Sequence, residues 1–231
     1  MLNILRDKKV IFFDVGYTLD KPASGDWMFT NRFLELAGGK LKQRTGTEIL
    51  EARDAGLHYL AQDHLIQSVE AEIQNFFGYY SIVSDKLDLG LTEEERNQIA
   101  RDRACNMKNY IPYPGIAEVL STLSKTYQLG IISDTWPSIE PQLEYIGVSQ
   151  YLSFTTFSCF VGVFKPDKRI YLDALNKGGV PAEETVFIDD AVHNLDGAAA
   201  LGITPILIAA NPASDVETSY TKIRDLSELI R

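Results

Sequence analysis

The stretch Val10-Ile-Phe-Phe-Asp-Val-Gly-Tyr-Thr-Leu19 decides the fold of this chain. Apolar residues that favour strands lead directly into a carboxylate, Asp14, and a glycine and a hydroxyl follow at Gly16 and Thr18. An uninterrupted apolar run of this kind is typical of a strand that is buried on both faces, as in a parallel sheet. Asp14 would then lie at the carboxyl end of the strand, where open α/β sheets bind their ligands.

The composition of the 231-residue chain is that of a globular protein with an acidic surface. Apolar residues make up 45% and charged residues 23% of the chain, and the formal net charge is −10. That charge disfavours binding to nucleic acid or to an anionic membrane. The cysteines Cys105 and Cys159 match neither a disulfide framework nor a metal site. Because the first residues also lack the pattern of a signal peptide, we expect a cytoplasmic protein.

Residues 20–110 have the periodicity of helices and show no strand-like run. Pro, Gly, Ser and Asp cluster at residues 20–26, which predicts a loop after the first strand. Apolar residues then recur at helical spacing over residues 27–110. Thr92, followed three residues later by Glu95, predicts a capped helix start. We therefore expect an all-helical domain over residues 20–110.

From residue 111 onward, strand-like runs alternate with helical segments. Strands are expected over residues 128–133, 154–157, 185–190 and 203–208. Helices are expected to begin near residues 116, 139, 166 and 195, with a closing helix over residues 222–230. Such an alternation predicts a mostly parallel sheet. The sequence thus predicts an α/β protein, with a Rossmann-like core from residues 1–19 and 111–231 and the helical domain inserted between them.

Several of the expected strands end in polar groups, which a parallel sheet would bring to one edge. The groups are Asp14, Ser133, Asp134, Asp189 and Asp190, together with Lys165 ahead of a later helix. Crowded carboxylates call for a divalent cation, and a site with only oxygen ligands suits Mg²⁺. A carboxylate at a strand end can also attack phosphorus, while Ser133 and Lys165 can donate hydrogen bonds to phosphoryl oxygens. The combination predicts phosphoryl chemistry.

Four segments resemble, in order, the motifs of the haloacid dehalogenase (HAD) superfamily, in the subgroup with a helical cap inserted after the first motif. They are Phe13-Asp-Val-Gly-Tyr-Thr-Leu19, Ile131-Ile-Ser-Asp134, Val163-Phe-Lys-Pro-Asp167 with Ile170 and Tyr171, and Phe187-Ile-Asp-Asp190 with Asn194. The resemblance covers essentially the whole chain. It implies the HAD fold and a hydrolase, first of all a Mg²⁺-dependent phosphatase that acts on a small phosphorylated metabolite through an aspartyl phosphate.

The resemblance also implies a role for each motif residue. The metal ligands would be Asp14, the backbone carbonyl of Gly16, Asp189 and Asp190. The catalytic residues would be Asp14 as the nucleophile, Lys165 and Ser133. The substrate would be held by Ser133, Asp134, Thr18 and Lys165. Residues 20–110 would form a lid that excludes water and selects the substrate. We expect a monomer or a homodimer.

Gly16 departs from the phosphatases of the family, which carry a second Asp at this position as general acid and base. Such help is typically worth about 10²–10⁴-fold in rate. The leaving group could be good enough to need little protonation, as in acyl phosphates. Alternatively, a residue of the cap could supply the proton, the candidates being His58, His64, Lys21 and Tyr17. Finally, the protein could be a slow or inactive relative that binds a phosphorylated ligand.

Two further reactions of the family also proceed without the second Asp. Dehalogenases need no metal and usually lack paired acids in the fourth motif, so Asp189 and Asp190 argue against dehalogenation. Phosphonate cleavage needs a lysine of the cap domain, and nothing in the sequence marks one of Lys40, Lys42, Lys86 and Lys108 for that role. His193 follows the acidic pair closely, but Mg²⁺ prefers oxygen ligands, so we expect this histidine at the surface or behind the ligands.

Overall fold

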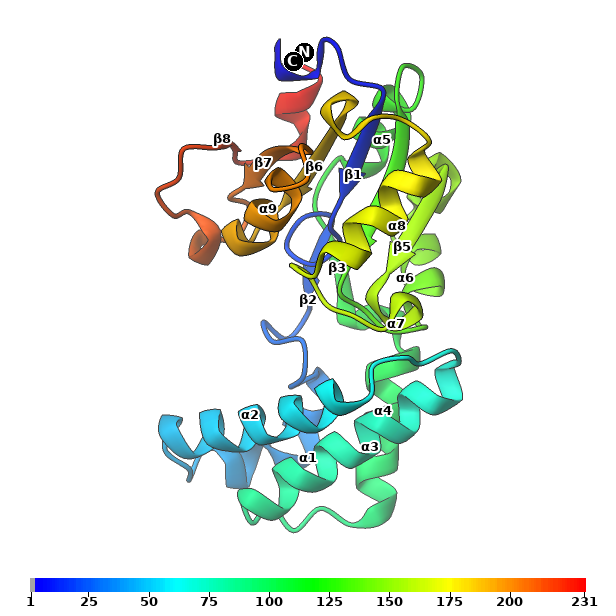
Figure 1. The fold of residues 1–231 in the computed structure, drawn as a ribbon. Coiled ribbons are helices and arrows are strands. Elements are labelled where there is room, and N and C mark those ends of the chain that lie inside the picture. The colour runs from blue at the N-terminus through cyan, green and yellow to red at the C-terminus, as the bar shows by residue number, and fades with distance from the viewer. Residues whose placement is uncertain (1–2) are drawn as a thin grey trace. The chain divides into compact units, whose positions relative to one another are not determined.

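The structure, a computed structural model, describes residues 3–231, which divide into two units. The α/β unit contains the chain up to residue 21, residues 111–135 and residues 139–231. The helical unit contains residues 22–110 and a short segment from Trp136 to Ser138. The chain passes between the units at β2 (Asp20–Pro22) and β3 (Tyr110–Pro112), which pair with each other, and again on either side of Trp136–Ser138 (Figure 1). The expectation of a plain loop at residues 20–26 is wrong for β2, because three residues are too few to show a strand pattern in the sequence.

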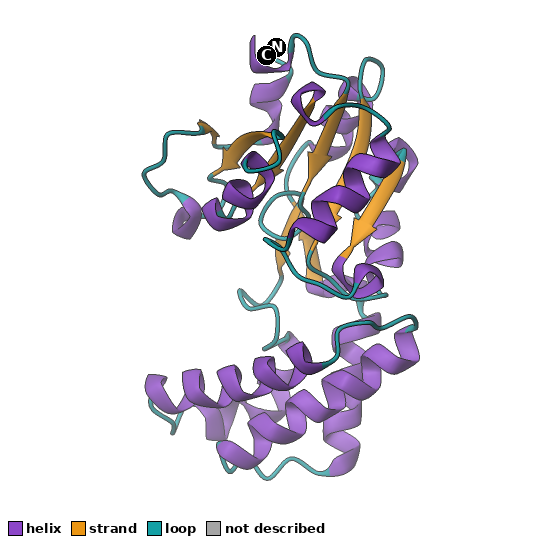
Figure 2. Cartoon of the chain, in the orientation of Figure 1, coloured by secondary structure: helices purple, strands orange, loops and turns teal. Residues whose placement is uncertain are grey.

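A six-stranded sheet forms the centre of the α/β unit, with the strand order β5-β4-β1-β6-β7-β8. Every neighbouring pair of these strands runs parallel. Figure 2 shows the strands in orange with helices beside them. The strands are β1 (Val10–Phe13), β4 (Gln128–Ser133), β5 (Phe154–Phe157), β6 (Thr185–Asp189), β7 (Thr204–Ile208) and β8 (Thr221–Ile223). The predicted α/β fold with a parallel sheet is confirmed.

Helices alternate with the strands, as the sequence predicts, except that the single turn α7, which was not predicted, also follows β5. They are α5 (Ile116–Leu123), α6 (Ile139–Tyr145), α7 (Ser158–Val161), α8 (Lys168–Gly178) and α9 (Val192–Ala199). Apolar side chains of α8 and α9 pack with those of the sheet in one core cluster, where Tyr171 lies edge-on to Phe187 at 6.0 Å between ring centres. In the sheet, Gly130 leaves room for Phe154, because a Cβ on this glycine would lie 2.2 Å from the ring.

The end of the chain differs from its prediction. A closing helix over residues 222–230 does not form, because β8 pairs with β7 and a single 3₁₀ turn, η6 (Leu226–Leu229), follows. Asp225 lies between the two in an extended conformation and caps the turn through the backbone N–H of Ser227. An extended N-cap residue marks the start of a helical segment, so no helix can run across this position. The prediction was wrong because apolar spacing alone cannot separate a short edge strand and a turn from one helix.

The helical unit consists of α1 (Asn31–Leu41), α2 (Gly46–Gln62), α3 (Val69–Lys86) and α4 (Glu93–Cys105) around one apolar core. The capping box predicted at Thr92 and Glu95 is present at the start of α4. Gly56 on α2 allows this helix to approach α3 closely, because a Cβ there would lie 2.6 Å from the ring of Tyr79. None of the helices within residues 3–231 combines the length and apolarity that crossing a bilayer requires.

The segment Trp136–Ser138 belongs to the helical unit because two kinds of contact hold it there. Glu72 on α3 is fully buried and accepts hydrogen bonds from the backbone N–H of Ser138 at 2.8 Å and from its hydroxyl at 2.6 Å. The indole of Trp136 packs against the rings of Phe76 and His64, at 5.0 and 4.9 Å between ring centres.

We expect Glu72→Ala to lower the free energy of unfolding by about 1–3 kcal/mol, because it leaves two buried donors of Ser138 without an acceptor. Urea denaturation measures this loss. The matched control is Glu70→Ala, an exposed position in the first turn of the same helix, which should change stability by less than about 0.5 kcal/mol. Equal losses in the two variants would contradict a structural role for the buried carboxylate.

Stability should fall in mild acid because of His64. Burial lowers the pKa of this imidazole from 6.5 to about 4. The folded chain therefore binds the proton less readily than the unfolded chain, so the stability that neutral His64 contributes is complete above pH 6.5 and is lost as the pH falls toward 4. We expect His64→Gln to flatten the pH dependence of the unfolding free energy in this window, whereas His58→Gln, at an exposed position, should leave it unchanged. An identical acid slope in wild type and His64→Gln would refute the assignment.

Candidate active site

The register of the sheet places Asp14 between two other strand ends. Phe13, the last residue of β1, pairs with Ile131 on β4 and with Ile188 on β6. Asp14 follows at the carboxyl end, and its backbone N–H donates to the carbonyl of Ile188 at 2.9 Å. Because the strands are parallel, the end of β4 with Ser133 and the end of β6 with Asp189 lie at the same edge of the sheet.

Lys165 joins two of these strand ends. Its Nζ donates to Oδ1 of Asp14 and to Oδ2 of Asp189, each at 2.7 Å, and to the carbonyl of Ile132 at 3.3 Å. The side chain of Lys165 is only 2% exposed, and that of Asp189 is fully buried. A buried ammonium between two carboxylates satisfies its donors and offsets the cost of removing all three charges from water.

The charges of the site do not balance within the protein. Asp14, Asp189 and Asp190 each offer an oxygen, and these oxygens lie within 4.8 Å of one another. Burial raises the pKa of Asp14 to about 8; Lys165 opposes this shift, and the two neighbouring aspartates add to it. Burial by itself would lower the pKa of Lys165, but the surrounding carboxylates outweigh it and raise this pKa, so the lysine stays charged. When all three acids are ionised, one ammonium leaves the site negative, and the raised pKa of Asp14 reflects this excess of negative charge, which a bound cation would relieve.

The two acids that end the fourth motif have different surroundings. Asp189 accepts hydrogen bonds at both oxygens, from Lys165, from the backbone N–H of Ala191 and from the side-chain amide of Asn194. Asp190 is half-buried and accepts a hydrogen bond from the hydroxyl of Ser214 at 2.8 Å. Its pKa is raised by burial and by the charge of Asp189. Hydrogen bonds from the protein thus occupy both oxygens of Asp189, whereas Asp190 has more free lone pairs with which to bind a cation.

These residues fit a hard divalent cation. Every donor in the cluster is a carboxylate oxygen, and hard cations such as Mg²⁺ take oxygen ligands and keep waters in their remaining positions. The cluster could therefore hold a metal ion.

The loop after Asp14 is held by its own backbone. The carbonyl of Val15 accepts from the N–H groups of Thr18, Leu19 and Asp20 at 3.1, 2.7 and 3.2 Å. Tyr17 takes a left-handed conformation with φ of 55°, which non-glycine residues adopt rarely. Gly16 is half-buried and offers only its backbone to the site, whereas Thr18 is fully buried.

Ser133 and Asp134 have separate surroundings. Ser133 ends β4 with 3% of its surface exposed, at the sheet edge that also carries Asp14. Asp134 is exposed, and its Oδ1 accepts from the backbone N–H of Lys165 at 2.9 Å. Asp134 therefore fixes the loop that carries Lys165. Its role as a direct substrate contact stays a prediction.

The predicted proton donors differ in their surroundings. His58 and Lys21 are exposed, and the lowered pKa of His64 leaves that imidazole neutral at pH 7. A neutral imidazole is a poor acid, so His64 is a weak candidate for protonating a leaving group. His193 is exposed on α9, as expected.

Two partners of the aspartates had no predicted role. Asn194 lies one helical turn after the acidic pair, and the sequence marks it only as part of the fourth motif. Ser214 lies 24 residues beyond Asp190 in a 3₁₀ turn, and no local signal connects the two.

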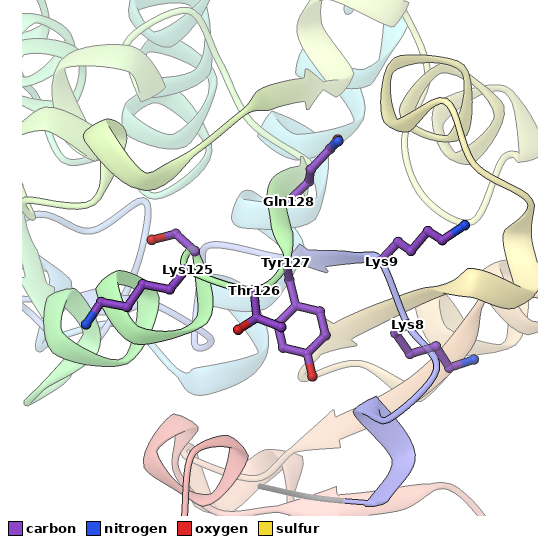
Figure 3. A pocket seen from close by; sticks show the side chains of 7 residues that line it. Lys8, Lys9, Lys125, Thr126, Tyr127 and Gln128 are labelled. Carbon is purple, nitrogen blue, oxygen red and sulfur yellow. The ribbon is translucent and has the colours of Figure 1, made fainter.

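A cavity of about 380 Å³ lies at the opposite end of the sheet, around Lys8, Lys9 and the start of β4. Figure 3 shows that Lys125 points away from Lys8 and Lys9. Lys8 donates to the carbonyl of Glu183 and to Thr204, and Lys9 pairs with Glu184 at 2.7 Å. These cations diverge and two of them are already paired, so the cavity is no candidate for an anion site.

Comparisons with known proteins reveal sequence relatives and proteins of similar fold. The chain is 29% identical over 131 residues to flavin mononucleotide hydrolase 1 of Arabidopsis thaliana, a match of 55% of this chain and about half (49%) of that protein. It is 27% identical over 162 residues to the GMP/IMP nucleotidase YrfG of Escherichia coli, covering 69% and 71% of the two chains. Its fold matches a 2-haloacid dehalogenase from Pseudomonas syringae, with a TM-score of 0.64, 21% identity and 96% coverage of both chains.

A family model of haloacid dehalogenase-like hydrolases matches residues 8–202, which include every residue of the carboxylate cluster and Lys165. The predicted resemblance is confirmed: the chain belongs to the haloacid dehalogenase-like hydrolases.

Proposed function

We propose that this hydrolase is a Mg²⁺-dependent phosphatase that acts on a small phosphorylated metabolite through an aspartyl phosphate on Asp14. The observation that carries the proposal is the cluster of three carboxylates closed by Lys165. A phosphate ester brings further negative charge, which such a cluster can accept only together with a divalent cation. The names of the two relatives, a flavin mononucleotide hydrolase and a nucleotidase, support phosphate esters as substrates.

In this proposal, Asp14 attacks phosphorus and Lys165 orients it. The hydrogen bond from Lys165 fixes Oδ1 of Asp14 and leaves the other oxygen as the nucleophile. A new bond from that oxygen to phosphorus forms as the ester P–O bond breaks, and the departing oxygen takes a proton from water because Gly16 has no side chain to give one. Water then attacks phosphorus and releases phosphate, which regenerates the Asp14 carboxylate. Ser133 donates to a phosphoryl oxygen.

The metal would be held by Asp14, Asp190 and the backbone carbonyl of Gly16. Bound there, Mg²⁺ supplies charge neutralisation for the phosphoryl group. Asp189 would act differently, by holding Lys165 and Asn194 in place through both of its oxygens. This division follows from the hydrogen bonds that already occupy Asp189.

The same cluster argues against dehalogenation. A dehalogenase displaces halide with a carboxylate and needs no divalent cation, so the crowding of Asp14 by Asp189 and Asp190 would only make the nucleophile harder to ionise. The net charge of −10 supports a small metabolite rather than nucleic acid or a membrane as the partner. We extend the proposal to a monomer or a homodimer in the cytoplasm.

We expect Asp14→Asn to reduce the hydrolysis of para-nitrophenyl phosphate to background, because an amide cannot attack phosphorus to form the acyl phosphate. EDTA should abolish the activity of the wild-type protein, and added Mg²⁺ should restore it. The control variant Asp7→Asn changes an exposed aspartate outside the site and should remain fully active. Full activity of Asp14→Asn would show that Asp14 is not the nucleophile. Turnover of 2-haloacids that persists in EDTA would show that the protein is a dehalogenase and not a phosphatase.

We expect Gly16→Asp to raise the hydrolysis of alkyl phosphates, because it supplies the acid that an alkoxide leaving group needs. The gain should lie within the range of about 10²–10⁴-fold that general acid catalysis provides. As the matched control, the same variant is assayed with an aryl phosphate. The leaving group of this substrate needs little protonation, so its rate of hydrolysis should change much less. An equal change for both substrates, or none, would show that a missing acid does not limit the reaction.

A further inference from the structure

A second cavity of the α/β unit, with a volume of about 330 Å³, borders the loop after Asp14 on the side of the C-terminal strands. We propose that it is a binding site for a small carboxylate with an apolar body, separate from the carboxylate cluster. None of Asp14, Lys165, Asp189 and Asp190 lines this cavity. Its walls come from the loop at Thr18, from the residues leading into α5, from the end of β7 and from the turn after β8.

The walls suit an apolar body. Pro114 and Ile116 contribute from the start of α5, Ile208 and Ala210 from the end of β7, and Leu226 from η6. An engineered cavity of about 150 Å³ with such walls is large enough to hold benzene. The volume here therefore admits one ring together with a polar substituent, and it lies near the lower limit of natural ligand sites, about 300–1,000 Å³.

Thr18 supplies an unsatisfied polar group at this cavity. It is fully buried, and its Oγ1 has no hydrogen-bond partner among the described residues. Burying a hydroxyl without a partner costs free energy, so such groups are rare and call for an explanation. A ligand atom in the cavity that pairs with this hydroxyl provides one.

Arg224 supplies a cation with unused donors. Its side chain is 79% exposed and lies 3.6 Å from Oδ2 of Asp215, whereas Lys222 takes Oδ1 of the same carboxylate at 2.7 Å. The neighbouring Asp225 also lines the cavity; its Oδ1 accepts from the backbone N–H and the hydroxyl of Ser227 and lies 3.9 Å from the guanidinium of Arg231. The planar guanidinium of arginine forms stronger hydrogen bonds with a carboxylate than with a neutral group. We therefore expect the ligand to be an anion.

Calorimetric titration of the full chain with benzoate tests the proposal. We expect saturable binding at one site at millimolar concentrations, with benzamide, the neutral isostere, binding at least about tenfold more weakly. Arg224→Gln should weaken benzoate binding by a similar factor. Arg6→Gln, which changes an exposed arginine of the same unit that does not line the cavity, should bind benzoate like the wild type.

Two further variants locate the site. Ala210→Phe should fill the cavity and abolish binding, whereas Asp14→Asn should bind benzoate as the wild type does, because Asp14 is not part of this cavity. Inorganic phosphate should not displace benzoate. The absence of saturable binding, equal affinity for benzamide, or unchanged affinity in Arg224→Gln would overturn the proposal. Displacement by phosphate, or loss of binding in Asp14→Asn, would place benzoate at the carboxylate cluster and overturn it as well. Because no step of this test measures hydrolysis, its failure is separate from failure of the proposed phosphatase activity.

Discussion

The structure of the site depends on one buried ammonium. Lys165 lies between Asp14 and Asp189 at 2.7 Å from each, almost without contact with water. Such a group is stable only while its partners stay charged and correctly placed, because a lone buried charge is costly. The partners come from β1 and β6, which are neighbours in the sheet although they lie far apart in the sequence. The parallel sheet therefore does more than bury apolar surface: it sets the distance between the carboxylates.

The same constraint explains the loops that surround the site. Asp134 accepts a hydrogen bond from the backbone N–H of Lys165. Asp189 accepts further hydrogen bonds from the side-chain amide of Asn194 and from the backbone N–H of Ala191. Each of these bonds fixes either the lysine or its partner. One ammonium cannot balance the three carboxylates of the cluster, and our proposal of a divalent cation and a phosphorylated substrate rests on this excess of negative charge.

The sequence predicts the main elements of both the α/β unit and the helical unit because their signals are local. The apolar run into Asp14 and the capping box at Thr92 each need only a few adjacent residues, and both are present in the structure. Short edge elements lack such signals: β8 has three residues and depends on its pairing with β7, so the apolar spacing there favoured a helix instead.

In the site, too, the sequence predicts what depends on adjacent residues and misses what depends on tertiary contacts. The strand-end aspartates are visible in the sequence, because parallel strands share an edge. The different surroundings of Asp189 and Asp190 are not visible, since they arise from a lysine 24 residues before Asp189 and a serine 24 residues after Asp190. The hydroxyl of Thr18, which has no hydrogen-bond partner among the described residues, also depends on tertiary packing, and the predicted contact of this residue with the substrate stays a prediction.

Calorimetric titration with Mg²⁺ alone tests most directly whether the carboxylate cluster binds a divalent cation. We expect one Mg²⁺ per chain in the wild type. Because burial raises the pKa of Asp14 to about 8, protons should compete with the metal, and affinity should weaken as the pH falls below that value. Asp190→Asn should abolish binding, whereas Asp196→Asn, at an exposed position on α9, should not affect it. A wild-type protein that binds no Mg²⁺, or an Asp190→Asn variant that binds it equally well, would contradict the account.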